Sequence, residues 1–384
     1  MRISFFATPA ARLLAFGISL FGISSFGAVS HLDATKYFLY VGSYSTHIQV
    51  YEFDSATGQL KSIGPAGEVE NPSWITASPD FRYLYAVSEL EGKTGAVAAF
   101  SINRSNASLH KLNTLSSAGV APCHATTDQT GKMVIVANYT TGGASSYPVE
   151  QDGRLGDMAS LMTAHGHGPN QERQEGPHAH EAVVTSDNKF VYVPDLGLDQ
   201  IRIYRIDPSH GTLTPNDPPF AKQDPGFGPR HIAFSPDEDF AYVMNELKST
   251  VTVFKRDKAN GSLIKIQDVS SVPPDYSGQN GPAEILIDST GKFVYATNRG
   301  ADTIAVFAVE PSQHTLRLIQ SVSAEGQMPR GLMIDPSGHF MFAGNQKTNN
   351  FVIYHIDAHS GQLTATGQVI HQPSPVSFLF VPQT

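Results

Sequence analysis

The sequence contains very little cysteine: Cys123 is the only one in 384 residues. An intramolecular disulfide is therefore excluded, and the fold must hold without cross-links even in an oxidising compartment. Cys123 stands next to His124 in APCHATTD, at the start of an apolar run. We interpret it as a small packed residue, with a nucleophilic role as the alternative.

Charged residues are scarce, at 16% of the chain, and positive charges are fewer than negative ones. The chain has 26 Lys and Arg residues and 35 Asp and Glu residues, which gives a formal net charge of −9. Because nucleic-acid binding depends on neutralising phosphates, we expect no nucleic-acid partner. Hydrophobic residues make up 40% of the chain, which is enough for a packed core and excludes a disordered chain.

Long hydrophobic runs are absent except near the N-terminus. Residues 1–30 carry only Arg2 and Arg12 as charges, followed by the apolar run LLAFGISLFGI and the small residues GAVS. This order is typical of a secretory signal peptide, and the run is shorter than the roughly 20 apolar residues of a membrane-spanning helix. We predict a signal peptide over 1–30, cleavage before His31, and a periplasmic or secreted protein without membrane contact. A retained N-terminal anchor is the alternative.

Helical periodicity is nearly absent, and short alternating apolar runs take its place. The stretch 176–213 contains three such runs separated by turn residues; SDNK follows the first run and DPSHG follows the third. The pattern recurs along the chain with a period of about 45 to 57 residues, which indicates a repeat architecture. The second runs of the repeats are YFLYVGSY (37–44), YLYAVSEL (83–90), MVIVANY (133–139), FVYVPDL (190–196), FAYVMNE (240–246), FVYATNR (293–299) and FMFAGNQ (340–346).

Four short antiparallel strands in each repeat are typical of the blade of a β-propeller. We predict an all-β fold in which residues 31–384 form one seven-bladed propeller. The first repeat has no first strand, and an additional run, SPVSFLFVP, follows the last repeat at 374–382. We expect this C-terminal strand to complete blade one and close the ring, which leaves no free sheet edge.

Polar side chains collect at one end of the predicted blades. In an antiparallel blade, the start of strand one and the end of strand two lie at the same edge. Loops on a rigid scaffold commonly carry function, so we expect the site at this end of the channel, with a base beside cations that hold an anionic substrate. The longest break in the repeat, 157–176, is predicted to join two blades at this end and to form a lid or pocket wall. The candidate catalytic residues are Glu246, His180, His178 and Arg230, and the candidate substrate-binding residues are Arg330, His231, Arg173, Arg299 and Glu284.

Several strings of the sequence point to one family when they are taken together. They include NPSWITASPDFRYLYAVSEL, VANYTTGG, NQERQEGPHAH, GPRHIAFSPD and YVMNEL. Over residues 36–382 the chain resembles the bacterial 6-phosphogluconolactonase-like lactonases, which are seven-bladed propellers related to fungal carboxy-muconate lactonizing enzymes. The resemblance implies lactone hydrolysis or its reverse without a required metal, with a His, a Glu and arginines at the channel mouth. The matching positions are the His178/His180 pair, Arg230, Glu246 and Arg330. We therefore expect a monomer that acts on a small-molecule lactone and uses no cofactor.

Two other functions remain open from the residues. The first is metal-assisted hydrolysis with His178, His180 and Glu181 as ligands, although strand alternation predicts that Glu181 points away from both histidines. The second is a non-catalytic secreted propeller that binds a carbohydrate or protein partner through the same mouth. No P-loop or dinucleotide fingerprint is present, and GASSY (143–147) lacks the second glycine of a nucleophile elbow.

Overall fold

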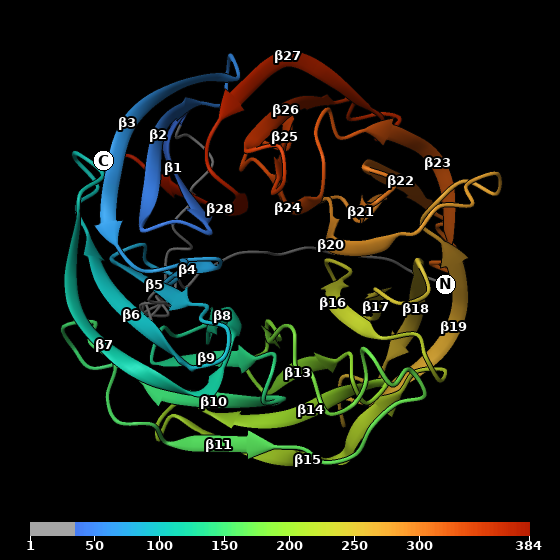
Figure 1. Cartoon of the computed structure of the whole chain (residues 1–384), viewed down its shortest axis with the longest axis horizontal. Coiled ribbons are helices and arrows are strands. Elements are labelled where there is room, and N and C mark those ends of the chain that lie inside the picture. The colour runs from blue at the N-terminus through green and yellow to red at the C-terminus, as the bar shows by residue number, and fades with distance from the viewer. Residues whose placement is uncertain (1–34) are drawn as a thin grey trace, which may run out of the picture. The chain divides into compact units, whose positions relative to one another are not determined.

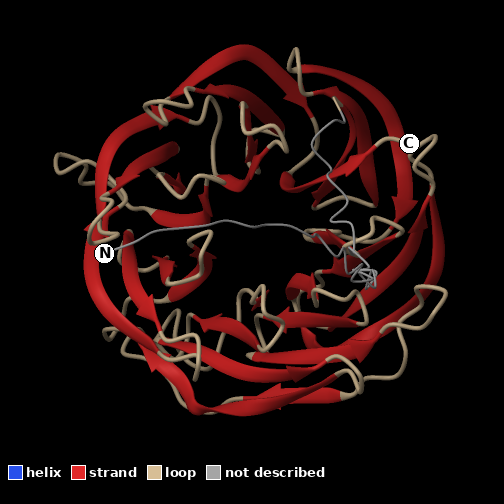
Figure 2. Cartoon of the chain, turned by 180° about the vertical axis from the view of Figure 1, so that it is seen from behind, coloured by secondary structure: helices blue, strands red, loops and turns tan. Residues whose placement is uncertain are grey.

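A computed structural model describes residues 35–384, which form a closed ring of seven four-stranded antiparallel sheets (Figure 1). Strands and loops make up this whole part of the chain, which contains no helix (Figure 2). The described residues accordingly include no helix with the length and apolar character needed to cross a membrane. The prediction of an all-β, seven-bladed propeller is confirmed. The predicted signal peptide at 1–30 lies outside the described residues.

The blades follow one another around the ring, and the strands run from the centre outward within each blade (Figure 1). Blade 1 consists of β28 (Pro375–Pro382), β1 (Lys36–Ser43), β2 (His47–Asp54) and β3 (Gln59–Glu68), and blade 2 of β4 (Ile75–Ala77), β5 (Tyr83–Ser88), β6 (Thr94–Ile102) and β7 (Leu109–Val120). Blade 3 consists of β8 (Pro122–Thr127), β9 (Met133–Asn138), β10 (Gly143–Pro148) and β11 (Ser160–Thr163), and blade 4 of β12 (Val183–Val184), β13 (Phe190–Asp195), β14 (Gln200–Asp207) and β15 (Thr212–Lys222). Blade 5 consists of β16 (Pro229–Phe234), β17 (Phe240–Asn245), β18 (Thr250–Arg256) and β19 (Leu263–Ser270), and blade 6 of β20 (Gly281–Ile287), β21 (Phe293–Arg299), β22 (Thr303–Val309) and β23 (Leu316–Ser323). Blade 7 consists of β24 (Pro329–Ile334), β25 (Phe340–Asn345), β26 (Asn350–Ile356) and β27 (Leu363–His371).

The two ends of the described chain meet in blade 1, as predicted. Strand β28 pairs with β1 in antiparallel register from Tyr37↔Pro382 to Gly42↔Ser377. Phe380 of β28 packs against Phe53 of blade 1 and Phe342 of blade 7, with ring centroids 5.3 and 5.2 Å apart. The C-terminal strand therefore belongs to the core between the first and last blades.

We expect deletion of residues 375–384 to abolish cooperative folding. The deletion removes Val376, Phe378, Phe380 and Val381, which are all at least nine-tenths buried. At about 1.5–3 kcal/mol for each buried apolar side chain, the loss approaches the whole stability of a domain, about 5–15 kcal/mol. Deletion of 383–384 alone is the control. A thermal unfolding curve of the longer deletion that overlays the wild-type curve would show that the strand is dispensable.

Tyrosines in the second strand of several blades tie each of these blades to the following one. The hydroxyl of Tyr40 donates to the carbonyl of Ala107 at 2.9 Å, and the hydroxyl of Tyr192 donates to that of Gly261 at 2.6 Å. Tyr85 and Tyr295 make the same contact with Gly153 and Gly361. Because a buried hydroxyl needs a partner, each pair fixes one blade against the turn of its neighbour.

Asparagines at the ends of second strands make a corresponding contact with the preceding blade. The side-chain amide of Asn138 donates to the carbonyl of Ser117 at 3.1 Å. Asn298 donates to Ser271 at 2.8 Å, and Asn345 donates to Ala324 at 2.9 Å. These recurring asparagines are thus structural residues that tie the mouth-side ends of neighbouring blades together.

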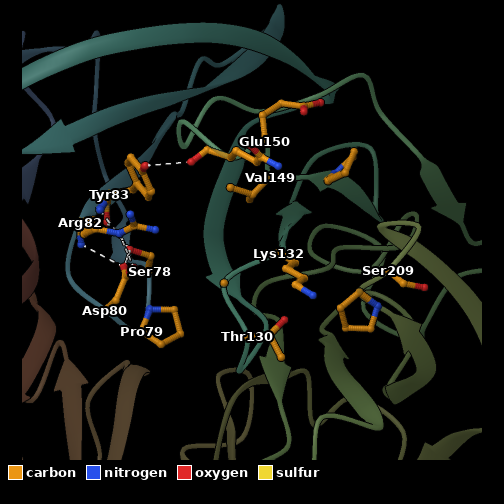
Figure 3. A pocket seen from close by; sticks show the side chains of 14 residues that line it. Ser78, Pro79, Asp80, Arg82, Tyr83, Thr130, Lys132, Val149, Glu150 and Ser209 are labelled. Carbon is orange, nitrogen blue, oxygen red and sulfur yellow. Dashed lines mark hydrogen bonds and ion pairs between the residues drawn. The ribbon is translucent and has the colours of Figure 1, made fainter. Parts of the chain in front are cut away.

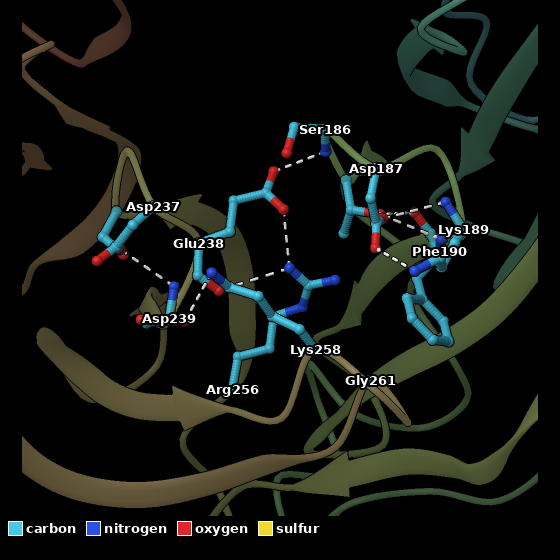
Figure 4. A network of polar contacts seen from close by, with 12 residues as sticks. Ser186, Asp187, Lys189, Phe190, Asp237, Glu238, Asp239, Arg256, Lys258 and Gly261 are labelled. Atoms are coloured by element: carbon cyan, nitrogen blue, oxygen red, sulfur yellow. Dashed lines mark hydrogen bonds and ion pairs between the residues drawn. The ribbon is translucent and has the colours of Figure 1, made fainter. Parts of the chain in front are cut away.

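A buried arginine joins blades 4 and 5 at the opposite end of the ring (Figure 4). Arg256 of β18 donates from Nη1 to Glu238 Oε2 at 2.8 Å and from Nε to the Tyr192 hydroxyl at 3.0 Å. Glu238 Oε1 in turn accepts a hydrogen bond from the backbone N–H of Ser186 at 2.7 Å. The two charges form an ion pair with each other, so this network stabilises the interface between the blades.

Candidate active site

A cavity of about 570 Å³ lies at the centre of one end of the ring, and every blade contributes to its wall. Its lining includes Tyr44, Glu89, Cys123, Tyr139, His180, Arg173, Glu246, Arg299, Arg330 and Gln346. A second hollow of about 550 Å³ shares Arg173, Glu246 and Arg299 with it. The polar residues that the sequence predicts at one end of the blades therefore surround a concave site.

Strand pairing explains why these residues meet. Pro229 at the start of β16 pairs with Asn245 at the end of β17, and the same proline–asparagine pair occurs in blades 3, 6 and 7. The residues that follow these prolines and asparagines consequently lie at one edge of each blade. In blade 5 these residues are Arg230 and Glu246, whose Nε and Oε2 atoms lie 2.9 Å apart.

Three arginines contact the carboxylate of Glu246. Arg173 Nη2 lies 2.7 Å from Oε1, and Arg230 Nε and Arg299 Nη2 each lie 2.9 Å from Oε2. Although burial acts in the opposite direction, these guanidinium groups hold the pKa of Glu246 well below its ordinary value. Glu246 therefore stays anionic, and both of its carboxylate oxygens contact guanidinium groups, which suits it to holding the arginines in place.

The four arginines of the site differ in their access to the cavity. Arg173, Arg299 and Arg330 line the cavity, whereas Arg230 is 1% exposed and lies beneath it. Arg230 donates from Nη1 to the carbonyl of Ala283 in addition to its contact with Glu246. Arg230 is thus placed to fix Glu246, and the other three guanidinium groups can reach a ligand.

Arg330 belongs to a separate polar group on the far wall of the cavity. Its Nη2 lies 3.9 Å from Glu89 Oε1, and its guanidinium lies 5.5 Å from the centroid of the Tyr44 ring. The Tyr44 hydroxyl donates to Glu89 Oε2 at 2.8 Å. Glu89 therefore orients both Arg330 and Tyr44 toward the cavity.

The two candidate histidines occupy different places. His180 lines the cavity, and burial together with the nearby Arg230 lowers its pKa well below the ordinary value, so the ring is neutral. His178 stacks on Tyr139 with centroids 4.6 Å apart, and its Nε2 lies 3.1 Å from Glu175 Oε1. Only His180 presents its ring to the cavity.

Cys123 lies against His180 in the cavity wall. Its Sγ is 3.7 Å from His180 Nδ1 and 3.2 Å from the His180 carbonyl oxygen. Burial raises the pKa of the Cys123 thiol far above its ordinary value, so the nucleophilic thiolate is disfavoured. This geometry supports the interpretation of Cys123 as a packed residue.

The expectation that Glu181 points away from His180 is wrong. Ala179 pairs with Asp195 and Val183 with Tyr192, so one strand advances by four residues where its partner advances by three. The additional residue is a β-bulge, which breaks the alternation of side chains. As a result, the side chains of His180 and Glu181 both face His231. The rings of His180 and His231 have centroids 5.2 Å apart, and Glu181 Oε1 lies 3.9 Å from His231 Nδ1.

A second layer of polar residues lies deeper in the channel than His180. His231 Nδ1 is 2.8 Å from Glu284 Oε1, and His124 Nε2 is 3.7 Å from Glu181 Oε1. Burial lowers the pKa of both histidines, raises the pKa of Glu181, and raises that of Glu284 to about 8. His231 and Glu284, which the sequence suggests as substrate-binding residues, are absent from the cavity lining.

The prediction that the long segment 157–176 joins two blades needs one correction. Its beginning, Ser160–Thr163, is strand β11, the outer strand of blade 3, so the loop between the blades starts after Thr163. This loop carries Arg173 to Glu246, and Gln174 Nε2 anchors it by donating to the carbonyl of Leu196 at 2.8 Å. The loop therefore forms part of the cavity wall, as predicted.

Another cavity, of about 400 Å³, lies among the hairpin turns of blades 2, 3 and 4 (Figure 3). Its polar side chains largely contact one another: Arg82 Nε donates to Asp80 Oδ2 at 2.5 Å, and the Tyr83 hydroxyl donates to the Gln151 carbonyl at 3.3 Å. These are ordinary turn contacts. The cavity at the other end of the ring therefore remains the candidate active site.

Several lining residues were not among the predicted candidates. Tyr44, Glu91 and Gln346 all line the central cavity. Tyr44 and Gln346 directly follow second strands of the repeat, so the same edge argument could have identified them. Glu91 lies further along the loop after β5, where the repeat pattern carries no signal.

Comparisons with known proteins agree with this architecture. A family described as "Lactonase, 7-bladed beta-propeller" matches residues 38–380. The 6-phosphogluconolactonase of Bacillus subtilis is 36% identical over 354 residues, covering 91% of this chain and 99% of the relative. A 6-phosphogluconolactonase of Formosa agariphila is 31% identical over 334 residues, covering 85% of this chain and 94% of the relative. The solved structure of a periplasmic gluconolactonase from Pseudomonas aeruginosa superposes with a TM-score of 0.85 at 31% identity, covering 91% of this chain and 100% of that one. The chain therefore belongs to the lactonase family of seven-bladed β-propellers.

Proposed function

We propose that this protein is an exported lactone hydrolase that opens a sugar lactone or a carboxylated lactone in the central cavity. The observation that carries the proposal is a neutral histidine, His180, in one cavity with three arginines that can reach a ligand. Membership of the lactonase family supports the reaction class. The relatives named above act on lactones of sugar acids according to their names.

His180 is the proposed general base. A neutral imidazole can take a proton from water while the water oxygen attacks the lactone carbonyl carbon. Cleavage of the ring C–O bond then releases an alkoxide, which receives the proton from the imidazolium. The products are a carboxylic acid and a hydroxyl on one open chain; the acid releases its proton to solvent to become a carboxylate, and His180 returns to its neutral form.

The arginines are proposed to bind the substrate and the developing negative charge. Arg299 and Arg330 face the cavity from blades 6 and 7, and Arg173 faces it from the loop before blade 4. Planar guanidinium groups can hold a carboxylate or phosphate with two parallel hydrogen bonds. Arg230 and Glu246 are proposed to act indirectly: Glu246 positions Arg299 and Arg173, and Arg230 holds Glu246.

The charge of the site favours anionic substrates. Four arginines lie in or under the cavity, compared with three carboxylates, those of Glu89, Glu91 and Glu246. The site is therefore rich in positive charge although the formal net charge of the chain is −9. A charge-assisted hydrogen bond contributes about 1.5–3 kcal/mol, so we expect lactones with a phosphate or carboxylate to exceed neutral lactones about tenfold or more in kcat/KM.

Arg299→Lys should raise KM for the anionic lactones and affect neutral lactones less. Arg82→Lys, at the other end of the ring, is the control.

A lactone screen with product detection tests the proposal. The purified protein without residues 1–30 is assayed with neutral sugar lactones, phosphorylated sugar lactones and carboxylated lactones. Turnover of at least one class, with loss in the His180→Gln variant, is the expected result. Binding without any turnover would overturn the proposal in favour of a secreted propeller that binds a carbohydrate or protein partner.

Export is the second part of the proposal. It is supported by the sequence of residues 1–30 and by the periplasmic relative from Pseudomonas aeruginosa. N-terminal sequencing of the protein from the cell envelope should find a chain that begins near His31. A chain that retains residues 2–12 would contradict export with cleavage.

A further inference from the structure

The deeper layer of the channel contains two glutamates that, within the described part of the chain, make no ion pair with a lysine or an arginine. Glu181 and Glu284 are 6% and 3% exposed. Among residues 35–384, the only cationic-type side chains within 4.0 Å of their carboxylates are His124 and His231. Two buried carboxylates that lie close together are costly unless they bind protons or a cation.

Three of these residues present ligand atoms to one point. One ligand atom each from Glu181, His231 and Glu284 lies within 4.8 Å of the other two. His231 Nδ1 lies 2.8 Å from Glu284 Oε1 and 3.9 Å from Glu181 Oε1. Ligands at about 2.1 Å from one ion are at most about 4.2 Å apart, so both measured pairs already fit, and a shift of a few tenths of an ångström completes the set.

An independent observation at the same place also points to a ligand. Glu284 Oε2 and His231 Nε2 are buried without a hydrogen-bond partner within the described chain. Buried polar atoms of this kind are rare and need an explanation such as an ion or a water molecule. Glu284 Oε2 belongs to a residue of the cluster, so an ion bound there would account for this unsatisfied atom, whereas His231 Nε2 lies on the side of its ring opposite to Nδ1.

We propose that Glu181, His231 and Glu284 bind one divalent metal ion of the Zn²⁺ or Mn²⁺ class in the central channel. Two carboxylates neutralise a divalent cation, so the ion and its ligands would together carry no net charge. Carboxylate and imidazole ligands together suit these ions, whereas Ca²⁺ and Mg²⁺ prefer oxygen ligands alone. This site differs from the alternative derived from the sequence, because His178 pairs with Glu175 and His180 lines the cavity.

His124 is the positioning residue of the proposed site. Its Nδ1 accepts a hydrogen bond from the backbone N–H of Ala182 at 3.3 Å, which leaves the proton of the neutral ring on Nε2. This nitrogen lies 3.7 Å from Glu181 Oε1, and a shift of a few tenths of an ångström would bring it to hydrogen-bond distance of the carboxylate. The ligands come from blades 5 and 6 and from the segment just before β12 of blade 4. A bound ion would therefore join three consecutive blades at the axis of the ring.

Metal content and thermal stability test this proposal without an activity assay. Untagged protein is unfolded in urea with a chelator, refolded with Zn²⁺ or Mn²⁺, passed through a desalting column and measured by mass spectrometry for metal. We expect about one equivalent per chain, and a rise in Tm of about 3 °C or more when the metal is in hundredfold excess over its Kd. Preference for Ca²⁺ or Mg²⁺, or less than about one tenth of an equivalent of every metal, would overturn the proposal.

Matched variants locate the metal. Glu284→Gln and Glu181→Gln should each retain less than about one tenth of an equivalent and show no metal-dependent rise in Tm. Without metal both should melt at or above the wild-type temperature, because a costly buried carboxylate is gone. Glu91→Gln, at the exposed rim of the cavity, should bind metal as the wild type does. Equal metal retention in wild type and Glu284→Gln would place the ion elsewhere and contradict the site.

Discussion

Glu246→Gln is expected to lower both the stability of the protein and its turnover of lactones. The substitution keeps the shape of the side chain but leaves Arg173, Arg230 and Arg299 without their shared carboxylate. Loss of one partner from a buried ion pair costs about 3–5 kcal/mol, because the remaining charge stays buried. Displacement of the arginines by about 1 Å can reduce the rate about 10²-fold. Urea denaturation and steady-state kinetics on the best lactone of the screen measure the two effects.

The pH dependence of this stability loss follows from the lowered pKa of Glu246. A carboxylate whose pKa is depressed in the folded state contributes its stability above the unfolded value of 4.5, and this contribution is lost as the pH falls toward the folded value. The difference in unfolding free energy between wild type and Glu246→Gln should therefore be constant from about pH 8 to pH 5.5 and shrink below about pH 4.5. Glu246→Asp, which keeps the charge, should recover part of the stability. Wild-type melting and turnover in Glu246→Gln would refute the role of this carboxylate.

His180→Gln is expected to reduce kcat by about 10² to 10⁴, the usual contribution of a positioned general base. Glutamine can fill most of the space of the imidazole but cannot accept and return the proton. The ring contacts Cys123 and His231 without an ion pair to a carboxylate, so we expect only a small change in Tm. KM should change less than kcat, since the arginines that bind the substrate are untouched.

His178→Gln is the matched control for this experiment. His178 precedes His180 by two residues, but it contacts Tyr139 and Glu175 and does not line the cavity. We expect at most about a tenfold loss in kcat, because the substitution acts only through the packing of Tyr139. A larger loss in His178→Gln than in His180→Gln would reverse the assignment of the base.

The repeat pattern of the sequence was sufficient for most of the fold. Seven apolar second strands, the missing first strand of the first repeat and the additional run at 374–382 led to a closed propeller, and the pairing of β28 with β1 confirms it. Such features are local: they need only the alternation of apolar residues, turn residues between them and the rule that sheets leave no free edge. The edge that carries Arg230 and Glu246 followed from strand order in the same way.

The sequence by itself determined the ring, its closure and the end of the channel at which polar residues collect, because these depend on periodicity along the chain. Only the tertiary structure decided which of these residues contact one another. Glu246 meets Arg173 from the preceding loop and Arg299 from the next blade, and no pattern within one repeat encodes these distances. The β-bulge before Val183 turned Glu181 toward His231, against the alternation that the sequence predicts. The side chain at such a position is set by one additional residue in the strand and by its neighbours across the channel, and both become visible only in three dimensions.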